Sequence, residues 1–161
     1  TISRGLPSAG HSARSVLVGP GGKLSLSVGS SCNLCDERDS LRAAVSQFNR
    51  DGSGGRIFAK GLRNTVGMAF NPKTGELWGN NNDRDNLGDD IPPEHVNIIK
   101  DGRNYGWPQC YLPGKPNPEY GSAGRPPARY HRRVGCRPAD QAMIRRAVDR
   151  LGPGRAMIPR S

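Results

Sequence analysis

The chain has 161 residues, which is about the length of one average domain, and only 34% of them are hydrophobic and 6% aromatic. Its 22 glycines and 14 prolines favour many short strands joined by turns. No run approaches the ~18 apolar residues of a membrane helix, and no N-terminal stretch has the charged-then-apolar pattern of a signal peptide. We therefore expect a soluble chain without a membrane span or an export signal of its own.

The net charge of +10 is distributed very unevenly. Residues 1–120 hold 14 Lys and Arg against 12 Asp and Glu, whereas residues 121–161 hold 10 Arg, no Lys and 2 Asp. The first segment is predicted to be the folded domain, and the second a poorly structured basic tail that is either read out of frame or disordered. Arginine without lysine is typical of a GC-rich gene read out of frame, although a genuine basic tail remains an alternative. A tail that binds nucleic acid would normally interleave aromatic residues, so we expect no nucleic-acid partner.

A hairpin pattern occurs twice, at residues 15–29 and 66–80. Each copy has an apolar strand, a turn with Pro and Gly, and a second strand that begins with Leu. The distance from Pro20 to Pro72 is 52 positions, and from Leu24 to Leu77 it is 53. Recurrence of a hairpin at this spacing predicts an all-β fold built from β-propeller blades. A third copy would fall near residue 124, where the sequence does not fit.

The stretch between the hairpins is ambiguous. Leu41, Ala44, Val45 and Phe48 have the i, i+3, i+4, i+7 spacing of an amphipathic helix. In a propeller, residues 42–49 would instead form an outer strand before the turn at 51–54, and we prefer this interpretation. Further elements are expected as strands at 56–59, 96–100 and 104–107 and a short helix at 142–151.

Six motifs follow one another through the first 120 residues. They are LPSAGHSAR at 6–14, GSSCNLC at 29–35, NRDGSG at 49–54, GLRNTVGMAF at 61–70, NDRDNLGDDIPPE at 82–94 and NYGWP at 104–108. This ordered set resembles the soluble quinoprotein sugar and sorbosone dehydrogenases. The resemblance implies that residues 1–120 are part of a six-bladed β-propeller that binds pyrroloquinoline quinone (PQQ) and Ca²⁺ at the top of its central channel.

The same resemblance implies a function and a location. Such an enzyme oxidises a sugar, a polyol or a sorbosone-type aldehyde by hydride transfer to PQQ and passes electrons to an acceptor such as a cytochrome or a quinone. It implies a periplasmic or secreted protein. The first blades and later cofactor-gripping cations are not matched, so this chain alone is expected to bind PQQ poorly and to have little activity. The alternative is a non-catalytic propeller-type binding module or an inactive fragment.

The resemblance implies that four residues near the starts of the two hairpins act in chemistry or in cofactor binding. His11 matches the family's general base, and an imidazole suits that role because it exchanges protons near neutral pH. Arg63 and Asn64 match a cofactor-contacting pair, in which a planar guanidinium can bind carboxylates and quinone oxygens. Arg14 is a weaker cofactor candidate that could instead support His11. Without the resemblance, His11 is an ordinary loop residue and Arg63 a solvated hairpin residue.

The loop at 80–90 is rich in oxygen donors, which Ca²⁺ prefers. An EF-hand is excluded because Leu87 stands where a ligand is needed and two prolines at 92–93 would obstruct the exiting helix. The resemblance implies that Arg84 and Asp85 contact the cofactor, with Asp83 and Asp85 as candidate calcium ligands. The individual ligands cannot be identified from the sequence, and a solvated acidic loop without metal is the alternative.

Four cysteines and two aromatic residues remain. By spacing alone Cys32 and Cys35 form half of a zinc site, a redox pair or a local disulfide, and the resemblance favours the Cys32–Cys35 disulfide. For Cys110, pairing with Cys136 stays open. The aromatic side chains in the 104–108 motif line a sugar site or pack between blades, and we prefer packing.

Overall fold

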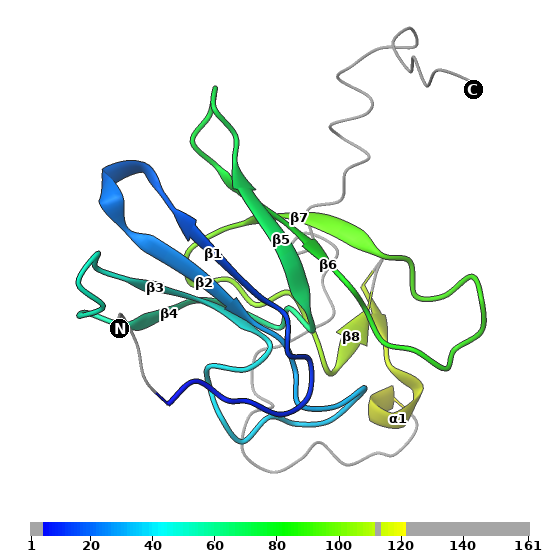
Figure 1. Ribbon diagram of the computed structural model, residues 1–161. Coiled ribbons are helices and arrows are strands. Elements are labelled where there is room, and N and C mark those ends of the chain that lie inside the picture. Colours follow the sequence, from blue (N-terminus) through cyan, green and yellow to red (C-terminus); the bar gives the residue numbers. More distant parts are fainter. Residues whose placement is uncertain (1–4, 112–113, 122–161) are drawn as a thin grey trace, which may run out of the picture.

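The computed structural model describes residues 5–111 and 114–121, and these form antiparallel sheets with almost no helix (Figure 1). The first sheet has the order β1-β2-β3-β4, the second β5-β6-β7 and the third β8-β9. The strands are β1 (Arg14–Val18), β2 (Leu24–Val28), β3 (Ala44–Phe48), β4 (Arg56–Lys60), β5 (Thr65–Phe70), β6 (Leu77–Asn81), β7 (His95–Ile99), β8 (Cys110–Tyr111) and β9 (Lys115–Pro116). The short helices are η1 (Pro20–Gly22) and α1 (Pro118–Gly121).

The two predicted hairpins are confirmed and occupy equivalent places in the two larger sheets. β1 pairs with β2 so that Val16 faces Leu26, and β5 pairs with β6 so that Ala69 faces Trp78. Each sheet then continues with the next strand in the chain, which is the meander of a propeller blade. The first sheet has four strands, and three strands of the second are present.

The helical alternative between the hairpins is wrong. Residues 44–48 form β3, which lies between β2 and β4 and is therefore the third strand rather than the outermost. Apolar residues do not alternate here because both faces of the strand are covered: Val45 is fully buried and its neighbour Ala44 is 1% exposed. The strands predicted at 56–59 and 96–100 are confirmed as β4 and β7.

The strand predicted at 104–107 is wrong. Only an isolated parallel bridge joins Asn104 to Lys60, and the segment is held instead by single bonds from Tyr105 N to Lys60 O (2.9 Å) and from Trp107 N to Gly61 O (3.2 Å). Pro108 has no amide hydrogen with which to extend a ladder. The rings of Tyr105 and Trp107 are 4% and 5% exposed, so they pack inside the structure rather than line an open mouth.

The core lies between the two larger sheets. The buried members of the core come from both parts of the structure and are Val45, Ala59, Leu62, Leu77, Ile99 and Tyr105. Four partly buried side chains pack against them: Leu17, Phe58, Met68 and Phe70. The first strands of the two sheets, β1 and β5, lie side by side (Figure 1). Ser15 Oγ on β1 donates to Val66 O on β5 at 2.6 Å. Sequence-distant hydrophobic residues therefore fix the two sheets against each other.

The loops that follow β2, β4 and β6 meet at one end of the sheets. Backbone bonds join them: Ser30 N donates to Arg63 O (2.7 Å), Leu62 N to Ala43 O (3.1 Å) and Asn82 N to Asn64 O (3.0 Å). Residues from three distant sequence motifs are thus brought within hydrogen-bond distance. This loop end holds the candidate site.

Two sequence predictions lie beyond the described residues. The helix at 142–151 and the character of the basic tail both fall within 122–161, as does Cys136. Within 5–111 and 114–121, no helix is long and apolar enough to cross a membrane.

Candidate functional site

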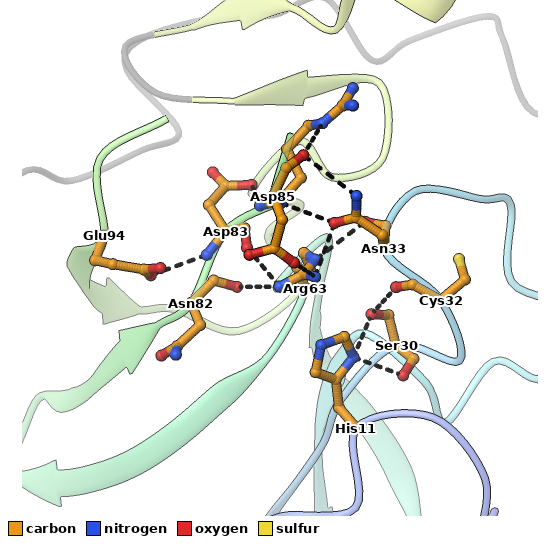
Figure 2. Close-up of polar contacts among 10 residues, drawn as sticks. His11, Ser30, Cys32, Asn33, Arg63, Asn82, Asp83, Asp85 and Glu94 are labelled. Carbon is orange, nitrogen blue, oxygen red and sulfur yellow. Dashed lines mark hydrogen bonds and ion pairs between the residues drawn. The ribbon is translucent and has the colours of Figure 1, made fainter. Parts of the chain in front are cut away.

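The structure holds His11 by its Nδ1 atom. Gly10 has a φ of +76°, and a Cβ there would lie 2.5 Å from Ser31 Cα, so only glycine lets this loop approach the end of β2. His11 Nδ1 then lies 2.9 Å from both Ser30 O and Ser30 Oγ (Figure 2). Ser30 Oγ donates its own hydrogen to Cys32 O at 2.7 Å.

These contacts favour one tautomer of the neutral imidazole. Ser30 O can only accept, and Ser30 Oγ has an acceptor of its own in Cys32 O, so a ring proton on Nδ1 suits both contacts. In that tautomer Nε2 of His11 is the unprotonated nitrogen. No bond to Nε2 is recorded within the described chain, so this nitrogen is able to accept a proton from a bound molecule.

Asn64 lies beside His11. A Cβ on Gly29 would be 2.5 Å from Asn64 Oδ1 and 2.6 Å from His11 Cβ, so glycine at this position lets the two residues approach each other. Asn64 Oδ1 is buried and has no hydrogen-bond partner among the residues described. The two predicted site residues are thus neighbours, and one of them has an unsatisfied acceptor.

Arg14 supports the His11 loop rather than facing an open site. Its Nη1 donates to His11 O at 2.5 Å and to Ala13 O at 2.8 Å, and its Nη2 donates to Pro7 O at 2.5 Å. Burial, with a smaller effect from the nearby Arg42 charge, lowers the pKa of Arg14. Of the two roles considered for Arg14, the geometry favours support.

Arg63 is 3% exposed, and the protein itself accepts from each of its nitrogen atoms (Figure 2). Nε donates to Asn33 O (3.0 Å), and Nη2 donates to Asn33 Oδ1 (2.9 Å) and Asp85 Oδ2 (3.1 Å). Nη1 donates to the carbonyls of Asn82 (3.4 Å) and Asp83. All five N–H groups of the guanidinium are therefore satisfied. Burial lowers the pKa of Arg63, and the charge of Asp85 opposes this.

Asn33 is a central contact that the sequence motifs do not identify. Its carbonyl and side-chain oxygen both accept from Arg63, its Oδ1 also accepts from Asp85 N (2.8 Å), and its Nδ2 donates to Asp85 O (3.2 Å). It lies inside the ring closed by the Cys32–Cys35 disulfide, which the structure contains. Its position between two cysteines is the only signal that the sequence offers.

The acidic loop contains residues in different environments. Burial raises the pKa of Asp83 to about 6, although its bond from Arg84 N and the charge of Arg63 oppose the shift. Asp85 has a side chain that is 74% exposed. Arg84 is turned away from Arg63 and pairs with Glu119 of α1 at 2.5 Å. Asp85 is therefore the exposed partner of the buried Arg63, and Asp83 is buried as well.

The calcium prediction has no formed site in the part of the chain that the structure describes. The only cluster there of at least three His, Cys, Asp or Glu ligand atoms is Cys32, Cys35 and Glu37, and its two sulfurs are joined in the disulfide. Asp83 and Asp85 belong to no such cluster. In addition, Arg63 already uses the carbonyls of Asn82 and Asp83, so these residues do not fit Ca²⁺ as arranged.

The site residues fit an anionic cofactor such as PQQ at one position, the Nη2 atom of Arg63. Arg63 has one acceptor that is an exposed side chain, the carboxylate of Asp85. A ligand carboxylate that displaced it would meet the same N–H group, whereas the other four bonds end on Asn33 or on backbone carbonyls. Nε2 of His11 and Oδ1 of Asn64 are the other groups at this end of the sheets that have no hydrogen-bond partner among the described residues.

Comparisons with known proteins agree with this architecture. The model of the glucose/sorbosone dehydrogenase family matches residues 6–124. An uncharacterised protein of Borreliella burgdorferi is 33% identical over 119 residues, which cover 73% of this chain and 31% of that protein.

Solved structures show the same fold. The PQQ domain of pyranose dehydrogenase from Coprinopsis cinerea, in its holo form, is 26% identical with a TM-score of 0.56, over 68% of this chain and 34% of that one. An oxidoreductase from Thermus thermophilus, described as a glucose dehydrogenase, is 27% identical with a TM-score of 0.53, over 68% of this chain and 38% of that one. A Trichoderma reesei enzyme of carbohydrate-active family AA12 has a TM-score of 0.57 at 24% identity, over 68% and 35%.

These neighbours are β-propellers, and the chain spans about a third of their length. The two larger sheets therefore correspond to blades of a β-propeller, as the hairpin repeat predicts. With a family model matched over most of its described residues, the chain belongs to the glucose/sorbosone dehydrogenase family.

Proposed function

We propose that the chain is part of a quinoprotein dehydrogenase that oxidises a sugar, a polyol or a sorbosone-type aldehyde. The observation that carries the proposal is the placement of His11, whose Nδ1 contacts Ser30 O and Ser30 Oγ while Nε2 has no hydrogen-bond partner among the described residues at the loop end of the blades. Family membership supports the reaction class. PQQ, when bound, supplies a quinone that accepts hydride from the substrate carbon.

His11 acts in this proposal as the general base. Nε2 takes the proton of the substrate hydroxyl while a hydride leaves the carbon that bears this hydroxyl, and the C–O bond becomes C=O. The Nδ1–H bond to Ser30 O keeps the ring oriented and stabilises the imidazolium that results. Ser30 is therefore a positioning residue, and Arg14 holds the loop from the other side through His11 O.

Arg63 is the proposed anchor for a cofactor carboxylate, with Asp85 displaced from Nη2 on binding. Asn64 and Arg84 remain proposed contacts, supported by their places beside His11 and Asp85. Calcium at the loop of Asp83 and Asp85 also remains a proposal, and it requires a rearrangement of that loop.

The sugar or polyol substrate, an acceptor such as a cytochrome or quinone, and a periplasmic or secreted location are part of the same proposal. The Cys32–Cys35 disulfide supports the location, because disulfides persist mainly in oxidising compartments. The runner-up is a propeller-type binding module without cofactor, and the observation that favours it is that the protein itself satisfies every donor of Arg63.

The test is a titration of the purified chain with PQQ and Ca²⁺, followed by quinone absorbance, and then a dye-reduction assay with aldoses and sorbosone. We expect weak, saturable binding that Arg63→Ala abolishes, with little dye reduction because the chain spans a third of its relatives. Strong dye reduction would show that the chain suffices alone. Absence of saturable binding at any PQQ concentration would reject the cofactor assignment in favour of the binding module.

A further inference from the structure

The segment from Ser30 to Cys35 touches both halves of the candidate site. Ser30 binds His11, and Asn33 binds Arg63, although the two partners lie in different motifs. We propose that Asn33, held within the Cys32–Cys35 ring, is a positioning residue that orients Arg63 toward an anionic ligand. This inference rests on the proposed function, in which Arg63 anchors a cofactor carboxylate.

Two oxygen atoms of Asn33 accept hydrogen bonds from one edge of the guanidinium. Its carbonyl accepts from Nε at 3.0 Å and its Oδ1 from Nη2 at 2.9 Å. The opposite nitrogen, Nη1, is held by the carbonyls of Asn82 and Asp83. With both sides fixed, only the Nη2 hydrogen that meets Asp85 points to an exposed acceptor. Asn33 thereby decides which part of Arg63 a ligand can reach.

The same side chain also fixes Asp85. Oδ1 of Asn33 accepts from Asp85 N at 2.8 Å, and Nδ2 donates to Asp85 O at 3.2 Å. Arg63 and the acid that faces it are therefore both positioned by one carboxamide. Loss of the Asn33 side chain would therefore remove a partner from the buried guanidinium, which is costly, and would also release Asp85, the residue that contacts Nη2.

The disulfide gives the loop its rigidity. Cys32 and Cys35 are three positions apart, so the ring encloses the Asn33 peptide and restricts the direction of its carbonyl. The carbonyl of Cys32, in the same ring, accepts from Ser30 Oγ at 2.7 Å, and this bond helps to determine the tautomer of His11. One covalent ring thus supports the orientation of both the proposed base and the proposed anchor.

The direct readouts are the Nε–H and Nη2–H signals of Arg63 in the NMR spectrum of the full chain, identified by their absence in Arg63→Lys. Asn33→Ala removes Oδ1, which accepts from Nη2, and we expect exchange of the Nη2–H with solvent to be about tenfold faster. Asn33→Asp keeps an acceptor at Oδ1 and should restore slow exchange. Asn49→Ala is the matched control, because the Asn49 side chain bonds only to Lys23 and Ser53 in an exposed turn.

The disulfide is tested by Cys32→Ser with Cys35→Ser and by reduction of the wild-type chain. Both should accelerate exchange of the Arg63 Nε–H, because the Asn33 carbonyl that accepts from Nε is no longer restricted. Thermal melting of each variant distinguishes faster local exchange from global unfolding. Only variants that still melt cooperatively are compared with the wild-type chain. Exchange unchanged in Asn33→Ala would overturn the proposal, and exchange unchanged in the serine variant would overturn the role of the ring.

PQQ titration of the same variants links the geometry to the ligand. Asn33→Ala should weaken binding about tenfold relative to the wild-type chain, with Asn49→Ala close to wild type. Equal affinity in Asn33→Ala and wild type would overturn the positioning role while leaving the proposed function intact. If the wild-type chain binds no PQQ, the cofactor proposal fails, and the exchange measurement alone still decides whether Asn33 orients Arg63.

Discussion

Two loops hold equivalent places in the repeat and yet differ in chemistry. Residues 29–43 follow β2 and residues 82–94 follow β6, and both contact Arg63 from opposite sides. The first is tied by a disulfide and offers neutral oxygen acceptors, whereas the second is acidic and changes from buried Asp83 to exposed Asp85 within three residues. The hairpins thus repeat a scaffold, while the loops between strands carry the residues that differ and act.

Loss of Arg63 should break the connection between the two loops and give the largest effect. Arg63→Ala leaves the acceptors of Asn33, Asn82 and Asp83 without their donor, and we expect a loss of about 4 kcal/mol in the free energy of unfolding, measured with urea. Arg38→Ala, an exposed arginine of the same loop, is the control and should change little. A loss below about 1 kcal/mol for Arg63→Ala would show that the loops do not depend on this residue.

The shared scaffold is tested by a core substitution. Leu62 is 1% exposed and packs between the two sheets, so Leu62→Ala should cost about 3 to 4 kcal/mol in thermal or urea unfolding. Val16→Ala is the control, because Val16 is 62% exposed. If the two substitutions had equal effects, the two sheets would not share a core.

The acidic loop should make the stability of the chain depend on pH. Burial raises the pKa of Asp83 to about 6, so the folded chain holds this proton more tightly than the unfolded chain, and stability falls as pH rises from about 4 to 6. Asp83→Asn removes the penalty while keeping an acceptor for Arg84 N. We expect it to match wild type at pH 4 and to be more stable above pH 6, by on the order of 3 kcal/mol at most.

The measurement is the unfolding free energy of both proteins from pH 4 to 8. Asp89→Asn, in the same loop and exposed, provides the control for loss of one negative charge. A stability difference that does not change with pH would mean that Asp83 does not titrate in this range.

The smallest effect is expected away from both loops. Arg56 pairs with Asp101 at 2.6 Å and lies over the Phe58 ring at 5.3 Å, but both charged side chains are about half exposed. Arg56→Ala should therefore lower the melting temperature only slightly, because exposed ion pairs contribute little. A large decrease would show that stability is spread over the sheet surface rather than concentrated where the two loops meet Arg63.

Strand positions were largely predictable, because alternation of apolar residues and Pro/Gly turns are local properties of the chain. Two segments were harder to assign, and the reasons are also local. Val45 and Phe48 fit both the helical and the strand periodicity, and the aromatic alternation around Tyr105 is interrupted by Pro108. His11, Arg63 and Asp85 were named through family motifs, and the structure brings Arg63 and Asp85 together. Ser30 and Asn33 were not named, because neither residue type in a loop indicates a role by itself.

The sequence by itself determined the all-β repeat, its family and the charged residues of the candidate site. Only the tertiary structure decided that Asn33 contacts Arg63, 30 positions away, and Asp85, 52 positions away, and that Ser30 contacts Nδ1 of His11. The physical reason is that strand formation follows from neighbouring residues, whereas hydrogen bonds between loops depend on how the two sheets pack against each other. That packing is set by the buried residues the sheets share, and no single motif contains them.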